Sequence, residues 1–108
     1  MLSSLPEIML VYFHSTNTSQ TEAACACFAS DAIVHDEGRD HAGTTAIREW
    51  IEDTKRKYEP KVEPIRVQES GEKTIVTSSV SGNFPGSPVE LQFEFTLRNG
   101  KISNLFIQ

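Results

Sequence analysis

The sequence contains little cysteine: Cys25 and Cys27 are the only two among its 108 residues. They lie two positions apart in the alanine-rich stretch "EAACACFA", which is typical of a helix, where such positions point to different sides. A disulfide between them is therefore unfavourable, and a zinc site would need further ligands nearby. We interpret both as small apolar packing residues, and free thiols suit a reducing compartment, so we predict a cytoplasmic protein.

Basic residues and long apolar runs are also scarce. Ten Lys and Arg stand against fifteen Asp and Glu, a net charge of −5, and the longest basic run is "KRK" at Lys55–Lys57. A chain without a basic face is a poor partner for nucleic acid. The apolar run Ile8–Phe13 is too short to span a membrane and follows no basic segment, so we predict neither membrane association nor a signal peptide.

The chain carries no internal repeat, low-complexity segment or linker. Its length fits a single domain over residues 1–108. A domain of this size buries roughly 65% of the surface that its unfolded chain exposes, which is enough for one core with a small cavity.

The first half of the sequence predicts three helices and a strand. We expect a helix over about Leu5–Ser15 and a second, capped by Ser19, that ends near Ser30 and Asp31. "AIVHD" then reads as a strand that Gly38 interrupts, and the third helix runs from Thr44 or Thr45 until Pro60 stops it.

The second half predicts four strands. They are "PIRVQES", "KTIVTSSVSG", "PVELQFEFTLR" and "KISNLFIQ", and Asn99–Gly100 is a strong hairpin turn. Alternation of apolar and polar residues from Val89 to Arg98 gives this sheet one buried and one polar face. Helices packed on one face of a curved antiparallel sheet make an α+β domain.

This order of elements, together with "FASDAIVHDEG" followed by "AGTTAIREWI", resembles the SnoaL-like and ketosteroid-isomerase-like proteins of the nuclear-transport-factor-2-like superfamily. The resemblance implies a cone: a curved antiparallel sheet wrapped around the N-terminal helix, with three helices and an apolar pocket. Many members are homodimers through the outer face of the sheet. They include isomerases, dehydratases, epoxide hydrolases, polyketide cyclases and proteins without catalysis, so the fold alone selects no activity.

The resemblance assigns roles to two residues. Asp36, in "IVHDE", matches the general base of ketosteroid isomerase, and Tyr12, in "YFHSTN", matches the phenol that hydrogen-bonds the developing oxyanion. A carboxylate inside an apolar pocket is desolvated, which raises its pKa towards the working pH; ketosteroid isomerase is itself a standard example of such tuning. No cofactor is implied. The alternatives are a solvated acid at a strand end and a core tyrosine.

The second oxyanion donor of that enzyme, a protonated carboxylic acid, should fall near Phe93 in this chain. Glu94 is the nearest acid, but alternation turns it to the other face of the sheet. Steroid isomerisation itself is therefore not expected.

Aromatic residues are candidates for the lining of the pocket. We predict that Trp50, Phe93, Phe95 and Phe106 bind an apolar, oxygenated small molecule, and Phe84 belongs to the same aromatic group. The alternative for each of them is a place in the core.

The charged run after the strand is not predicted to bind metal. Adjacent strand residues diverge, so His35 should face away from Asp36, while Arg39, Asp40 and His41 should form a turn at the pocket rim. The function expected from the sequence is a small-molecule-binding protein, either a cofactor-independent isomerase, cyclase or dehydratase-like lyase that uses Asp36 and Tyr12, or a non-catalytic ligand-binding or homodimerisation module.

Overall fold

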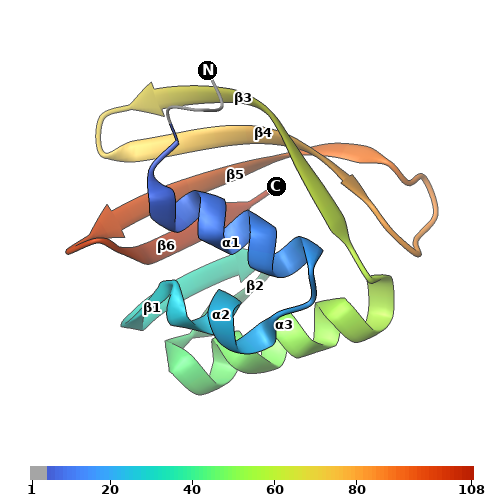
Figure 1. Ribbon diagram of the computed structural model, residues 1–108, viewed down its shortest axis with the longest axis horizontal. Coiled ribbons are helices and arrows are strands. Elements are labelled where there is room, and N and C mark those ends of the chain that lie inside the picture. Colours follow the sequence, from blue (N-terminus) through green and yellow to red (C-terminus); the bar gives the residue numbers. More distant parts are fainter. Residues whose placement is uncertain (1–4) are drawn as a thin grey trace.

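Three helices pack against one side of a curved six-stranded sheet in the computed structural model, which describes residues 5–108 (Figure 1). The elements are α1 (Glu7–Asn17), α2 (Thr21–Ala26), β1 (Phe28–Asp36), β2 (Arg39–Ala42), α3 (Gly43–Tyr58), β3 (Lys61–Ser70), β4 (Lys73–Ser81), β5 (Val89–Arg98) and β6 (Lys101–Ile107). The predicted α+β class and the cone-like arrangement of sheet around α1 are confirmed.

The sheet is mixed, whereas the sequence predicted a purely antiparallel one. Its strand order is β2-β1-β6-β5-β4-β3. Neighbouring strands are antiparallel except β1 and β6, which run parallel with Ile33 opposite Asn104 and His35 opposite Phe106. A parallel pair requires a long crossover between its strands, and here everything from β2 to β5 lies in that connection.

The second helix is shorter than predicted. It ends at Ala26 and β1 begins at Phe28, so the stretch up to Ser30 is strand instead of helix. The Ile102 amide donates to the Cys27 carbonyl at 2.9 Å, and Phe28 is buried in the core. Strand pairing with β6 therefore overrides the local helical preference of this alanine-rich segment. The predicted capping by Ser19 is also wrong, because Gln20 precedes the helix and no side chain caps it.

The charged run after β1 forms a tight hairpin. Glu37 and Gly38, both with positive φ, make the turn, and Arg39–Ala42 pair with β1 as the edge strand β2. The prediction that Arg39, Asp40 and His41 form a turn is corrected accordingly. The four later strands and the Asn99–Gly100 hairpin agree with the sequence patterns.

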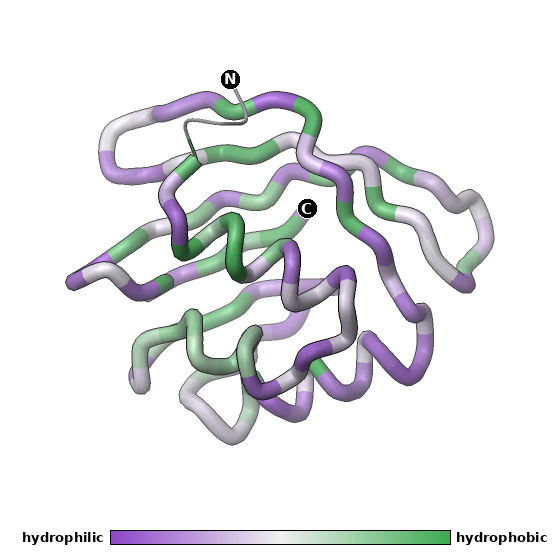
Figure 2. The backbone as a smooth tube through the Cα atoms, viewed as in Figure 1, coloured by the Kyte–Doolittle hydropathy of each residue, from purple (hydrophilic) through white to green (hydrophobic). Residues whose placement is uncertain are grey.

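The core lies between α1 and the concave face of the sheet. Met9 and Phe13 of α1 pack against Phe93 and Phe95 of β5, with ring centroids of Phe13 and Phe95 5.7 Å apart. Figure 2 shows the corresponding alternation of apolar and polar residues along the strands. The cavity described below lies beside the C-terminal half of α1.

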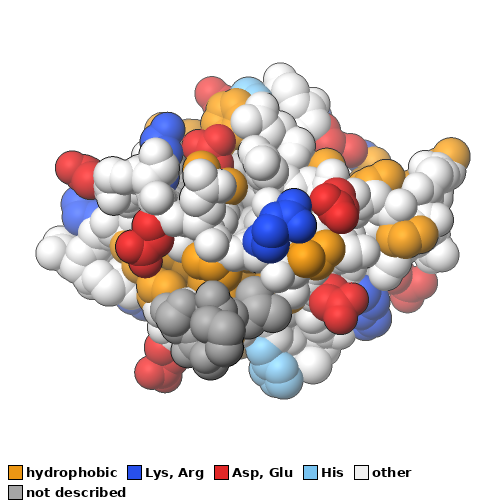
Figure 3. Space-filling view, turned by 90° about the horizontal axis from the view of Figure 1, so that it is seen from above, with side chains coloured by type: hydrophobic (Ala, Val, Ile, Leu, Met, Phe, Trp, Pro, Cys, Tyr) orange, Lys and Arg blue, Asp and Glu red, His pale blue; other side chains and the backbone are white. Residues whose placement is uncertain are grey.

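The surface is mixed in character. Acidic and basic side chains are interspersed with small apolar areas on the face shown in Figure 3. No helix within residues 5–108 is both long and apolar enough to cross a membrane.

Candidate functional site

A cavity of about 290 Å³ opens between the C-terminal halves of α1 and α3 and the concave face of the sheet. The helices contribute hydroxyl groups to its wall, and the strands contribute aliphatic and aromatic side chains. The lining residues from the helices and their flanking segments are Tyr12, Ser15, Thr16, Ser19, Gln20, Thr21, Ala24, Trp50, Ile51, Thr54, Lys55, Tyr58, Glu59 and Pro60. Those from the sheet and its turns are Asp36, Glu37, Val62, Val80, Phe84, Val89, Leu91, Phe93 and Ile107.

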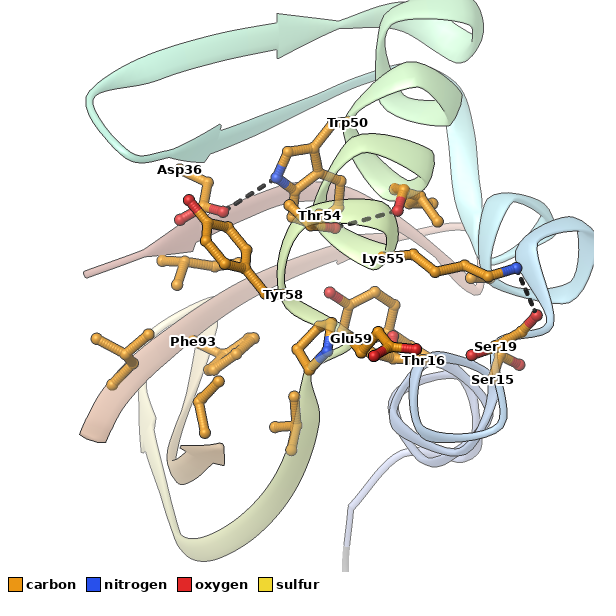
Figure 4. Close-up of a pocket in the computed structure, with 18 of the residues that line it drawn as sticks. Ser15, Thr16, Ser19, Asp36, Trp50, Thr54, Lys55, Tyr58, Glu59 and Phe93 are labelled. Atoms are coloured by element: carbon orange, nitrogen blue, oxygen red, sulfur yellow. Dashed lines mark hydrogen bonds between the residues drawn. The ribbon is translucent and has the colours of Figure 1, made fainter. Parts of the chain in front are cut away.

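Asp36 is the last residue of β1 and its side chain lies in the cavity. Its backbone continues the alternation that buries Val34 and turns His35 to the opposite face. Trp50 Nε1 donates a hydrogen bond to Asp36 Oδ2 at 3.0 Å (Figure 4). One carboxylate oxygen is therefore fixed against α3, and this side chain is held in place by an element distant in the sequence.

The environment raises the pKa of Asp36 above its ordinary value. Burial is the largest cause, because the cavity wall removes water from the carboxylate, and the nearby Glu37 carboxylate acts in the same direction. The Trp50 hydrogen bond, the Glu37 backbone N–H and His41 stabilise the ionised form and oppose the rise. The result is a carboxylate that binds a proton more readily than one in water.

Tyr12 is buried and reaches the same cavity from α1. Its ring packs edge-on against Phe13, Phe28 and Phe95 at centroid distances of 5.4, 5.7 and 5.8 Å. Burial raises the pKa of this phenol well above its ordinary value, although its hydrogen bond with the Thr16 side chain acts in the opposite direction. The hydroxyl group therefore stays protonated at neutral pH.

The rim of the cavity is held by contacts between distant segments. The Tyr58 hydroxyl donates to Glu37 Oε2 at 2.9 Å and joins the end of α3 to the β1–β2 turn. Lys55 Nζ donates to the Ser19 carbonyl at 3.3 Å on another part of the rim (Figure 4). These contacts fix the entrance to the cavity on two sides.

The four aromatic residues predicted to bind ligand do not form one group. Trp50 and Phe93 line the cavity. Phe95 is fully buried beneath Tyr12 and is a core residue. Phe106 lies on the outer face of the sheet, 39% exposed and stacked on His35 at a centroid distance of 4.2 Å, so its assignment to the pocket is corrected.

Several hydroxyl groups that line the cavity have no role in the sequence-based predictions. Among them are those of Tyr58 and Thr16, from the last turns of α3 and α1. Tyr58 follows Trp50 and Thr54 on one stripe of the third helix, and this helical spacing was the available signal. The spacing identifies an inward face without distinguishing core from cavity.

The charged residues of the hairpin point in different directions. His35 pairs with Asp40 outside the cavity, and Asp36 lies inside it. Within residues 5–108, no three His, Cys, Asp or Glu side chains are grouped in a way that could hold a metal ion. The polar groups that line the cavity are the carboxylates of Asp36, Glu37 and Glu59, the ammonium group of Lys55, phenols and aliphatic hydroxyls.

Solved structures of similar fold include proteins named for cyclase chemistry. A Sinorhizobium meliloti protein, named as a candidate polyketide cyclase, has 40% sequence identity and a TM-score of 0.95, over 100% of this chain and 99% of that one. A Pseudomonas putida protein of the same name has 19% identity and a TM-score of 0.82, over 95% and 89% of the two chains. The epoxide hydrolase/cyclase-like enzyme SalBIII, with a role in pyran ring formation in salinomycin, has 22% identity and a TM-score of 0.81, over 94% and 86%.

The family assignment rests on a sequence match over most of the chain. No match was found among curated protein sequences. The model of the SnoaL-like domain matches residues 11–105, a range that includes α1 from Val11 onwards, the whole sheet except its last residues, and every cavity residue except Ile107. The chain belongs to the SnoaL-like family.

Proposed function

We propose that this protein binds an apolar, oxygenated small molecule and catalyses a cofactor-independent proton transfer of the isomerase or cyclase type. Asp36 is the general base and Tyr12 the hydrogen-bond donor. The observation that carries the proposal is the Asp36 carboxylate inside the cavity, with one oxygen fixed by Trp50 and its pKa raised by burial. A base whose pKa approaches the working pH both ionises and accepts a proton effectively.

The proposed reaction begins at a carbon next to a carbonyl group. The ionised Asp36 carboxylate removes a proton from this carbon, and the electron pair of the C–H bond moves to the carbonyl oxygen to form an enolate. Tyr12 donates a hydrogen bond to that oxygen as its charge grows, which stabilises the transition state more than the bound ketone. Protonated Asp36 then returns the proton to another carbon, or the enolate carbon attacks an electrophile of the same molecule and closes a ring.

The cavity restricts the size of the substrate. Its volume of about 290 Å³ lies at the lower end of the range for small-molecule sites. One wall is formed by Val80, Val89, Leu91 and Phe93, while hydroxyl groups lie across from it. A molecule of one or two rings with one apolar face and a few oxygen atoms suits this lining.

Deuterium exchange tests the proposal without knowledge of the natural substrate. The bicyclic ketone 2-tetralone carries exchangeable protons next to its carbonyl group, and NMR measures their replacement in D2O. We expect the wild-type protein to accelerate exchange above the buffer rate and Asp36→Asn to lose about 100-fold or more of this acceleration. Asp40→Asn, which removes an exposed carboxylate of the same hairpin, is the matched control and should retain the rate. Equal rates for wild type and Asp36→Asn would contradict the role of Asp36.

We also propose that the protein is a homodimer through the outer face of its sheet. This dimerisation does not depend on catalytic activity, so it is also the role expected of a non-catalytic module. The supporting observation is an apolar area of Ile33 and Phe106, each 39% exposed, next to the ring of His35. Sedimentation should detect a dimer in the wild type and a monomer in Phe106→Glu. A monomeric wild type at high concentration would contradict this proposal.

A cytoplasmic location is part of the proposal as well. Cys25 and Cys27 support it, because both are free thiols and free thiols suit a reducing compartment. Cys27 is buried. Fractionation should recover the protein with cytoplasmic enzymes, and recovery outside the cell would contradict this location.

A further inference from the structure

The cavity combines aromatic rings with an excess of negative charge. Five of its lining residues are aromatic: Tyr12, Trp50, Tyr58, Phe84 and Phe93. Its charged lining residues are three carboxylates and one ammonium group, from Asp36, Glu37, Glu59 and Lys55, which gives −3 + 1 = −2 when all are ionised. The whole chain has the same sign, with a net charge of −5. This combination disfavours an anionic ligand.

The single ammonium group of the lining is held at the rim. Lys55 Nζ donates to the Ser19 carbonyl, and in Figure 4 the side chain extends towards Ser19 and away from Asp36. It is not among the groups that act on the pKa of Asp36. Within residues 5–108 no Lys, Arg or His side chain forms a salt bridge with Asp36, although His41 is near enough to lower its pKa.

Asp36 retains capacity to accept further hydrogen bonds. A carboxylate has about four acceptor sites on its two oxygens, and here Trp50 Nε1 and the Glu37 backbone N–H occupy two of them. Tyr58 lies close enough for the Asp36 charge to affect its pKa, and its ring stands beside the carboxylate in Figure 4. The Tyr58 ring packs edge-on against Phe84 with centroids 5.9 Å apart, which fixes its orientation.

We propose that this cavity selects a ligand that carries a compact ammonium group, such as a methylated amine, and places that group beside the Asp36 oxygen that Trp50 does not hold, next to the ring of Tyr58. Aromatic faces attract cations through their quadrupole, and the attraction increases when water is excluded. A cation beside Asp36 also favours the ionised carboxylate, which opposes the rise in pKa that burial causes. The inference rests on the proposed function in one respect: both place the ligand in the same cavity.

A pair of isosteric probes separates charge from shape. Choline and 3,3-dimethyl-1-butanol have the same outline, but only choline carries a positive charge. Trp50 is the only tryptophan of the chain, so its indole N–H resonance reports binding at this site directly. We expect choline to bind at least about tenfold more tightly than the alcohol in the wild-type protein, since cation–π and carboxylate attraction act together.

Two variants locate the origin of the preference. Asp36→Asn should remove most of the preference for choline, whereas the matched control Asp40→Asn, outside the cavity, should keep it. Phe93→Leu changes the cavity without a change in charge. It should weaken the binding of both probes by a similar factor, because Phe93 belongs to the apolar wall.

Three results would overturn the inference: equal affinities for the two probes, an unchanged preference in Asp36→Asn, or no response of the indole resonance to either probe. Each leaves the proton-transfer proposal standing, because deuterium exchange into the neutral 2-tetralone tests that proposal separately. Conversely, a wild type that prefers choline but exchanges no deuterium would support the ammonium site and contradict the proposed catalysis.

Discussion

The hydrogen bond from Trp50 to Asp36 gives the most direct control over the proposed base. Trp50→Phe keeps an aromatic ring on α3 and removes the indole N–H that lies 3.0 Å from Asp36 Oδ2. The ionised carboxylate loses a donor, while the burial that disfavours its charge remains. We therefore expect the pKa of Asp36 to rise above its wild-type value.

The size of this rise follows from the strength of the bond. A hydrogen bond to a charged group contributes about 1.5–3 kcal/mol, and one pKa unit corresponds to about 1.4 kcal/mol. If the bond is lost only by the ionised form, the pKa of Asp36 increases by about 1 to 2 units. Water that enters the space left by the indole would reduce the increase towards the lower figure.

Carboxyl ¹³C NMR titration of Asp36 measures this shift in the wild type and in Trp50→Phe. Tyr58→Phe is the control, because it removes a cavity hydroxyl that is bonded to Glu37 and not to Asp36. We expect a much smaller change in this control. An unchanged or lower pKa of Asp36 in Trp50→Phe, with the fold intact by circular dichroism, would refute the view that Trp50 stabilises the ionised base.

Three further substitutions test the packing that forms the cavity, each measured as the free energy of unfolding in urea. The Ser78 hydroxyl is fully buried and has no hydrogen-bond partner among residues 5–108, so Ser78→Ala should stabilise the protein by about 1 kcal/mol, and a loss of stability would indicate a missed partner. The Asn17 side chain accepts from Val62 N at 2.7 Å and donates to Val62 O at 2.8 Å, so Asn17→Ala should cost about 2–3 kcal/mol, and a cost near zero would contradict this link between α1 and β3. A Cβ atom on Gly82 would lie 2.6 Å from the Tyr58 carbonyl oxygen, so Gly82→Ala should cost about 1–3 kcal/mol, and an unchanged stability would mean that the end of α3 moves freely.

Local patterns in the sequence were sufficient for most of the fold. Alternation along Val89–Arg98 and the Asn99–Gly100 turn determine the β5–β6 hairpin from nearby residues alone. The end of α2 and the parallel pairing of β1 with β6 depend on contacts between residues more than 70 positions apart, such as Phe28 with Ile102. Local residue patterns carry no direct information on such distant pairings. They report only the helical preference of the alanine-rich segment, which the strand pairing overrides.

The residues of the candidate site were predictable where the alternation of side chains along a strand decides which of them face the cavity. Asp36 shares the inward face of β1 with Val34, as alternation requires. Phe106 was assigned to the pocket by its aromatic character, although Leu105 and Ile107 on either side of it face the concave side, which places Phe106 outside. The contribution of Tyr58 depends on how the end of α3 meets the β1–β2 turn, a tertiary arrangement that helical spacing does not define.

The central claim is that Asp36, with its pKa raised by the cavity, is the base for proton transfer. It is tested most directly by the pH dependence of deuterium exchange into 2-tetralone, measured beside the NMR titration of Asp36. Only the ionised carboxylate accepts a proton, so the rate should rise with pH and reach a plateau, with a midpoint equal to the pKa of Asp36 and above the ordinary aspartate value of about 3.9. A midpoint unrelated to the titration of Asp36, or the same profile in Asp36→Asn, would contradict the claim.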